Sequence, residues 1–169
     1  MAEQITIREV NGINKPKFMT KFGNIVEKCP QMALHLLTHR PYVNTYEIFS
    51  ALEQFFDSLT TEDKLKILLQ HPELGSQTKS ITEESLNEQT HAGLTVLSDE
   101  SKQAFMNLNA QYRNKFGFPF IICVQGHDPS RIVSLLQERL ESDVETEINR
   151  GIREVKKISK LRLSNLIID

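Results

Sequence analysis

The stretch NTYEIFSALEQFFDSL, residues 44–59, decides the fold of this chain. Asn44 is a favourable N-cap, and Glu47 follows it three residues later, as in a capping box at the start of a helix. Behind this start, apolar residues recur at helical spacing in the clearest amphipathic stripe of the sequence, which consists of Ile48, Phe49, Leu52, Phe55, Phe56 and Leu59. The stretch therefore predicts a helix with one face in a hydrophobic core.

Similar signals extend from this helix in both directions. Toward the N-terminus, Asn14 before Lys15 and Pro16 predicts a helix start, and helical spacing continues through Phe22 to Cys29. A second helix then begins at Pro30. Toward the C-terminus, residues suited to capping precede each further helical pattern, at Thr60, Thr82, Ser98, Asp128 and Ser142.

The last helix is the longest and runs to about Ile167, whereas residues 1–13 show no reliable period. The chain shows no internal repeat and no low-complexity linker. These patterns predict an all-α fold, with a single multi-helix domain of about eight helices over residues 1–169.

One apolar run, FGFPFIICVQG at residues 116–126, resembles a strand. Pro119 interrupts it, and no second strand is available to pair with it. We therefore predict one extended apolar connection at 117–125. Its backbone N–H groups need acceptors from the protein or from a ligand.

Composition excludes several classes of protein. The 169 residues include 20 Lys and Arg against 22 Asp and Glu, so no bulk affinity for nucleic acid or anionic membranes is expected. No apolar run approaches 18 residues, and the N-terminus lacks an apolar signal core. Cys29 and Cys123 form no CxxC motif, which suits a reducing compartment. The sequence predicts an intracellular protein without a metal or redox motif.

The candidate site lies in HPELGSQTKSITEESLNEQTHAGL, residues 71–94. His71 stands where Pro72 forces a helix to end. The next predicted helix carries polar residues on one face, at Ser85, Glu88 and Gln89, followed by Ala92. Such a stripe is commonly a solvated face, and a histidine at a helix end commonly interacts with the helix dipole. The alternative interpretation is the wall of a binding site.

A second candidate is Arg162 in the last helix. Five basic residues share one broad side of that helix: Arg150, Arg153, Lys156, Lys157 and Lys160. Arg162 instead continues the apolar stripe through Ile152 and Val155. Burying an unpaired guanidinium costs several kcal/mol, so the sequence requires an acceptor. The alternatives are an internal carboxylate such as Glu88, the oxygens of a ligand, or a side chain that reaches solvent.

Several motifs together resemble one enzyme family. They are FGNIVEKCP at 22–30, HPEL at 71–74, SLNEQTHAGL at 85–94, LNAQYRNKFGFPFIICV at 108–124 and EVKKISKLRL at 154–163. In this combination the chain resembles the 2-oxo-4-hydroxy-4-carboxy-5-ureidoimidazoline (OHCU) decarboxylases of urate degradation, from about residue 12 onward.

The resemblance implies an all-helical carboxy-lyase that converts OHCU to (S)-allantoin without a cofactor or metal. It also implies a homodimer with a functional link to hydroxyisourate hydrolase, and no nucleic-acid or membrane partner. The implied catalytic residues are His71 and Glu88. The implied substrate-binding residues are Pro72, Ser85, Gln89, Phe118, Phe120, Ile121, Ile122 and Arg162.

Two features depart from the family pattern. HPELGS replaces the usual HPDLAG after the histidine, which affects the loop. The chain ends in LIID and not in a peroxisomal tripeptide, so cytoplasmic and peroxisomal locations both remain open.

Two other classes of function compete with this interpretation. The basic side of the last helix suggests a non-catalytic helical interaction or RNA-binding module, although the near-neutral charge disfavours it. His35 and His39, four residues apart, suggest a metal hydrolase, but the glutamate of an HExxH motif is missing.

Overall fold

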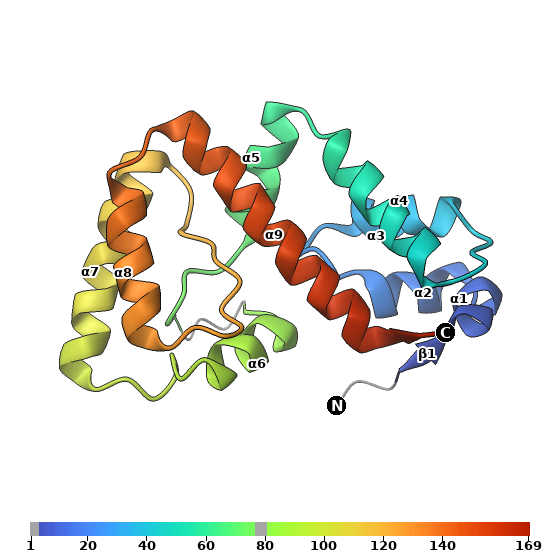
Figure 1. Cartoon of the computed structure of the whole chain (residues 1–169), viewed down its shortest axis with the longest axis horizontal. Helices are drawn as coiled ribbons and strands as arrows, with labels where there is room; N and C mark the ends of the chain where they lie inside the picture. Colours follow the sequence, from blue (N-terminus) through green and yellow to red (C-terminus); the bar gives the residue numbers. More distant parts are fainter. Residues whose placement is uncertain (1–3, 77–80) are drawn as a thin grey trace. The chain divides into compact units, whose positions relative to one another are not determined.

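The computed structural model describes residues 4–76 and 81–169, in which helices are the predominant secondary structure (Figure 1). The helices are α1 (Ile7–Gly12), α2 (Lys15–Phe22), α3 (Pro30–Thr38), α4 (Thr45–Asp57), α5 (Thr61–Gln70), α6 (Glu83–His91), α7 (Asp99–Phe116), α8 (Pro129–Leu140) and α9 (Val144–Leu166). Two short strands, β1 (Ile5–Thr6) and β2 (Ile167–Ile168), form a parallel pair. The predicted all-α class is confirmed, and residues 117–125 contain no strand, as expected.

The chain divides into two compact units. The first comprises Met1–Asp63 with Lys156–Asp169, and the second comprises Lys64–Val155. Helix α9 contributes residues to both units, as does α5. Among the described helices, none is long and apolar enough to cross a membrane.

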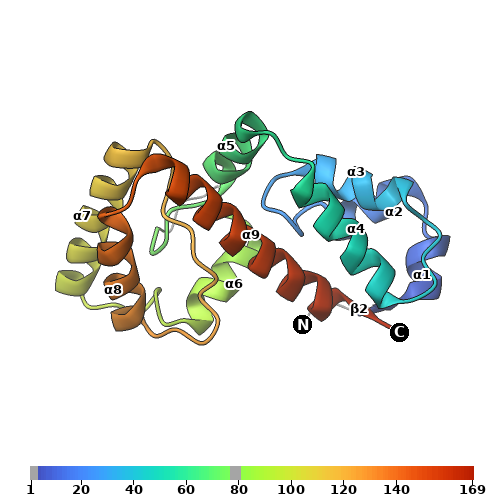
Figure 2. The ribbon, with the colours of Figure 1, turned by 45° about the horizontal axis from the view of Figure 1, so that its top comes forward.

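Helix α3 packs against α2 and α4 in the first unit (Figures 1 and 2). The core of this unit contains side chains that are almost completely buried, including Phe18, Phe22, Met32, Leu36, Ile48 and Leu52. The predicted cap of α4 is confirmed, because Asn44 Oδ1 accepts a hydrogen bond from the backbone N–H of Glu47 at 3.1 Å. Helix α4 therefore packs its apolar face into this core, as the sequence predicted.

The N-terminal residues contain more structure than the sequence predicted. Thr6 and Glu9 form a capping box at the start of α1, which has only six residues. A helix of less than two turns is too short to display a 3.6-residue period, so apolar spacing does not predict it. The Thr-x-x-Glu spacing was the available signal.

Two helix boundaries also differ from the prediction. Helix α2 ends at Phe22, before the expected Cys29, and Gly23 follows it. A Cβ on Gly23 would lie 2.5 Å from the carbonyl oxygen of Met19, so this position requires glycine. The apolar spacing beyond it reflects burial of turns and not a continuing helix. Helix α9 begins at Val144, where Asp143 and not Ser142 accepts the capping hydrogen bond.

Helices α7 and α8 lie side by side in the second unit (Figures 1 and 2). The predicted N-caps Thr82, Ser98 and Asp128 are confirmed, since each side chain accepts a hydrogen bond from the backbone N–H three residues later. These caps fix where α6, α7 and α8 begin and so determine which residues fill the intervening connections.

Candidate active site

His71 lies directly after the end of α5, where Pro72 prevents the helix from continuing. The residue is 7% exposed. The ring Nδ1 lies 2.9 Å from the carbonyl oxygen of Ile67. Because a carbonyl can only accept, Nδ1 carries a proton and donates it. The neutral ring therefore has its lone pair on Nε2, which is the nitrogen that can accept a proton.

Two buried side-chain amides hold the loop that follows His71. Gln89 Oε1 accepts a hydrogen bond from the N–H of Gly75 at 2.8 Å, and Asn109 Nδ2 donates to the carbonyl oxygen of Leu74 at 2.8 Å. The structure thus brings Gln89 of α6 to the His71 loop. Because its oxygen is occupied by Gly75, the Nε2 group of Gln89 is the part that can donate to a ligand.

The backbone conformation of Gly75 accounts for the glycine in HPELGS. Its φ is +76°, a left-handed conformation that glycine adopts without strain. A Cβ at this position would also lie 3.0 Å from the ring of Phe105 on α7. The backbone of the loop therefore passes close to α7.

Helix α6 turns its polar stripe inward. Ser85 and Gln89 are 5% and 3% exposed, and Glu88 is half-buried, whereas Leu86 is exposed. The interpretation of this stripe as a solvated face is therefore wrong for Ser85 and Gln89. Buried polar side chains at this spacing agree with the alternative interpretation, the wall of a binding site.

The segment from Phe118 to Ile122 is also buried, with each of Phe118, Phe120, Ile121 and Ile122 at most 6% exposed. Phe118 and Phe120 both contact the ring of Tyr112 edge-on. The carbonyl oxygen of Ile121 accepts a hydrogen bond from Arg139 Nη1 at 2.7 Å. Helices α7 and α8 thus hold both the side chains and the backbone of this connection.

Arg139 belongs to a buried polar network. Its Nε donates to Glu147 Oε2 at 2.7 Å, and Tyr112 donates its hydroxyl proton to the same oxygen at 2.5 Å. Burial raises the pKa of Tyr112, which keeps this hydroxyl protonated. Glu147 is completely buried, and Arg150 provides a second cation at its other oxygen.

Arg162 is 8% exposed, which confirms its predicted place in the apolar stripe of α9. Its Nη1 lies 3.1 Å from Glu27 Oε2 and donates to the carbonyl oxygen of Asn24 at 2.7 Å. An internal carboxylate was one of the predicted alternatives. The carboxylate that pairs with Arg162 in the first unit belongs to Glu27. Because Glu27 lies 135 residues away in the sequence, helical spacing did not identify it as a candidate.

The described residues contain no group of three His, Cys, Asp or Glu side chains that could hold a metal ion. His35 Nε2 lies 3.0 Å from the carbonyl oxygen of Ala51, and His39 Nδ1 lies 2.8 Å from that of His35. Both nitrogens therefore carry protons and cannot serve as metal ligands in this arrangement.

Sequence reasoning missed the residues that support the site, namely Asn109, Tyr112, Arg139 and Glu147. Arg139 had the same signal as Arg162, since it follows Ile132 and Leu136 at core spacing in α8. A cation at a core position of an amphipathic helix indicates a buried acceptor.

The comparisons with known proteins point to one family. The family model described as OHCU decarboxylase matches residues 11–164. The chain is 41% identical over 165 residues to the 2-oxo-4-hydroxy-4-carboxy-5-ureidoimidazoline decarboxylase of Amia calva, covering 95% of this chain and 94% of that protein. It is 37% identical over 166 residues to the Xenopus laevis protein of the same name, covering 96% and 95%.

A solved structure shows the same fold. The crystal structure of (S)-allantoin synthase aligns with a TM-score of 0.76 at 22% identity, over 96% of this chain. This chain spans 54% of that longer chain. The family match and the two relatives confirm the resemblance seen in the motifs, and the chain belongs to the OHCU decarboxylase family.

Proposed function

We propose that this protein decarboxylates OHCU to (S)-allantoin in urate degradation, with His71 as the residue that transfers the proton. The observation that carries this proposal is the hydrogen bond from His71 Nδ1 to Ile67, which fixes the tautomer and orients the ring. A buried histidine with one assigned nitrogen is suited to acid–base chemistry.

The reaction breaks the bond between the ring carbon and its carboxylate, and CO₂ leaves. The electron pair moves into the adjacent unsaturated part of the ring, where negative charge develops. A proton must then reach one face of the carbon that becomes the stereocentre of (S)-allantoin, while the ring hydroxyl loses its proton to become a carbonyl and the ring nitrogen gains one. In this mechanism His71 Nε2 supplies that proton, and general acid catalysis of this kind contributes about 10²–10⁴-fold.

The remaining site residues bind and orient the substrate. In this proposal Glu88, half-buried on the inward polar face of α6, orients the ring of His71. Ser85 and the Nε2 group of Gln89 donate to the ureido group, and Pro72 lines the same wall. The support for these roles is the inward polar face of α6 and the hydrogen bond that joins Gln89 to the loop after His71.

Fixed donors stabilise the charge that develops on the ring. The proposed donors are the N–H groups of Ile121 and Ile122, together with Arg162, while Phe118 and Phe120 exclude water. One well-placed donor in a dry site contributes about 3 kcal/mol. The support is the burial of these residues and the anchored backbone of residues 118–122.

Several further properties belong to the same proposal. Residues 1–169 act as one decarboxylase domain, without a cofactor or metal, because the adjacent unsaturated ring accepts the electron pair. The active form is a homodimer with a functional link to hydroxyisourate hydrolase. The place of action is the cytoplasm or the peroxisome.

The alternative of an RNA-binding or interaction module is less well supported. Lys156 of its basic face lies 2.5 Å from Glu53 and 3.5 Å from Asp57, and Lys160 also pairs with Glu53. These acidic partners neutralise part of the cationic surface. Binding to single-stranded RNA that weakens steeply with salt would favour this alternative.

The direct test supplies freshly generated OHCU with and without the protein and follows circular dichroism. We expect rapid formation of an excess of (S)-allantoin. A signal identical to the uncatalysed reaction would refute the proposal.

A further inference from the structure

We propose that Arg139 is a positioning residue that fixes the Ile121–Ile122 peptide so that the N–H of Ile122 donates to the reacting substrate. This inference rests on the proposed function and adds a residue that does not itself contact the substrate. It begins with the contact between Arg139 Nη1 and the carbonyl oxygen of Ile121, at 2.7 Å.

The direction of the Ile122 N–H follows from the geometry of the peptide group. The only cis peptide bond among the described residues is Arg40–Pro41, so the bond between Ile121 and Ile122 is trans. In a planar trans peptide the C=O and the following N–H point in opposite directions. Because Arg139 holds the carbonyl on its own side, the N–H of Ile122 points away from Arg139.

That N–H has the properties of a ligand donor. Ile122 is 6% exposed, and none of the described residues accepts a hydrogen bond from its N–H. The next N–H, of Cys123, differs because it donates to Glu154 Oε2 at 2.9 Å. Since buried backbone N–H groups are nearly always paired, this one is left for a bound molecule.

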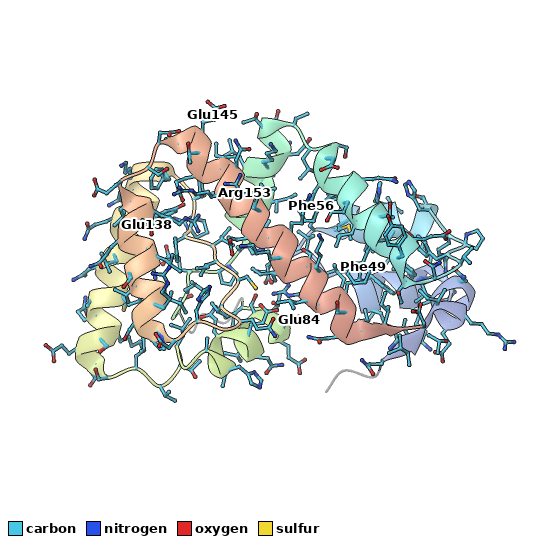
Figure 3. All side chains as sticks on the ribbon, viewed as in Figure 1. Phe49, Phe56, Glu84, Glu138, Glu145 and Arg153 are labelled. Carbon is cyan, nitrogen blue, oxygen red and sulfur yellow. The ribbon has the colours of Figure 1, made fainter. Side chains whose placement is uncertain are left out.

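Arg139 is itself held rigidly. Its guanidinium donates to Glu147 and to Tyr112, and its Cζ lies 4.6 Å from the centre of the Phe120 ring. Glu138, the residue before Arg139 on α8, is exposed (Figure 3), whereas Arg139 itself is buried. The planar guanidinium of Arg139 therefore fixes the positions of both the Ile121 carbonyl and the Phe120 ring. Lysine has no fork that could serve several acceptors at once.

The test compares the same substitution at two arginines of α8. In Arg139→Lys a cation remains beside Glu147, but the fork that reaches the Ile121 carbonyl is lost. We expect kcat to fall about 10- to 100-fold with KM within about twofold, because a misplaced donor affects mainly the transition state. Arg131→Lys is the matched control, since it makes the same change at an exposed arginine of the same helix. Its kcat should stay within about threefold of wild type.

A double variant and a measurement on the unmodified protein cover the case in which Arg139→Lys does not fold. Arg139→Met with Glu147→Met removes both buried charges together, which cores tolerate better than loss of one. Its kcat should also fall. In wild-type protein with ¹³C-carbonyl and ¹⁵N isoleucine, only Ile122 and Ile168 follow another isoleucine, so each gives a distinct amide signal. Adding (S)-allantoin should shift the Ile122 signal and leave that of Ile168 in place.

The outcomes separate this inference from the proposed function. A wild-type protein that makes no (S)-allantoin refutes the proposed function. An active wild type whose Ile122 signal does not move, or whose Arg139 variants turn over normally, overturns the inference alone.

Discussion

Replacing Arg162 by methionine tests whether this arginine serves the fold, the substrate or both. Its side chain is 6% exposed and lies 3.1 Å from Glu27, whose side chain is completely buried. Removing one partner of such a pair costs about 3–5 kcal/mol. In a chain of this length each kcal/mol lowers the melting temperature by about 2–4 °C. We therefore expect Arg162→Met to melt about 6–20 °C below wild type.

A second substitution separates stability from binding. Arg162→Met with Glu27→Gln removes the carboxylate charge as well, so it should recover at least half of the lost melting temperature. If Arg162 also binds the substrate, kcat/KM should remain about 30- to 1,000-fold below wild type, which corresponds to about 2–4 kcal/mol. The assays are thermal denaturation and (S)-allantoin formation.

The matched control is Arg153→Met, since Arg153 is an exposed arginine of the same helix (Figure 3). It should change neither the melting temperature nor the turnover. A double variant that regains stability and turns over like wild type would refute the binding role of Arg162.

Three further outcomes are expected. Gly75→Ala should lower the free energy of unfolding by about 1–3 kcal/mol, because the φ of this residue is +76° and the new Cβ meets Phe105. Gly12→Ala places its new Cβ in open space and should change stability little. Equal melting temperatures of the two variants would contradict this reasoning. Burial and the neighbouring His39 lower the pKa of His35 from 6.5, so the folded state binds this proton less readily than the unfolded chain. The free energy of unfolding should therefore keep its full value above about pH 6.5 and decrease below it, with a smaller decrease in His35→Gln. Identical melting curves of the two proteins from about pH 7.5 to 5 would argue against this cause. Dialysis against EDTA should leave the decarboxylase activity unchanged, whereas loss of activity that zinc restores would revive the metal hydrolase.

The sequence predicted the helices wherever a cap and a long apolar period coincide. Asn44 and Ser98 illustrate this, since each begins a helix of at least 13 residues at the expected position. The prediction failed where the signal was short or the spacing misleading. Helix α1 has six residues, and the apolar positions from Phe22 to Cys29 are buried without being helical.

The candidate site shows a similar limit. The polar stripe of α6 and the buried place of Arg162 follow from helical spacing, which is a local property. The acceptor for Arg162 and the partners of Arg139 depend on contacts between distant segments, which spacing does not encode. Local periodicity could therefore indicate that a buried cation needs a partner, but could not identify Glu27 or Ile121.

The central claim is that His71 transfers the proton in the decarboxylation of OHCU. Its most direct test is the rate of (S)-allantoin formation by His71→Asn, which retains a hydrogen-bonding side chain of similar size but no titrating nitrogen. We expect the variant to keep the far-ultraviolet circular dichroism of the wild type and to lose at least about 100-fold in kcat. A folded His71→Asn protein that forms (S)-allantoin at nearly the wild-type rate would contradict the account.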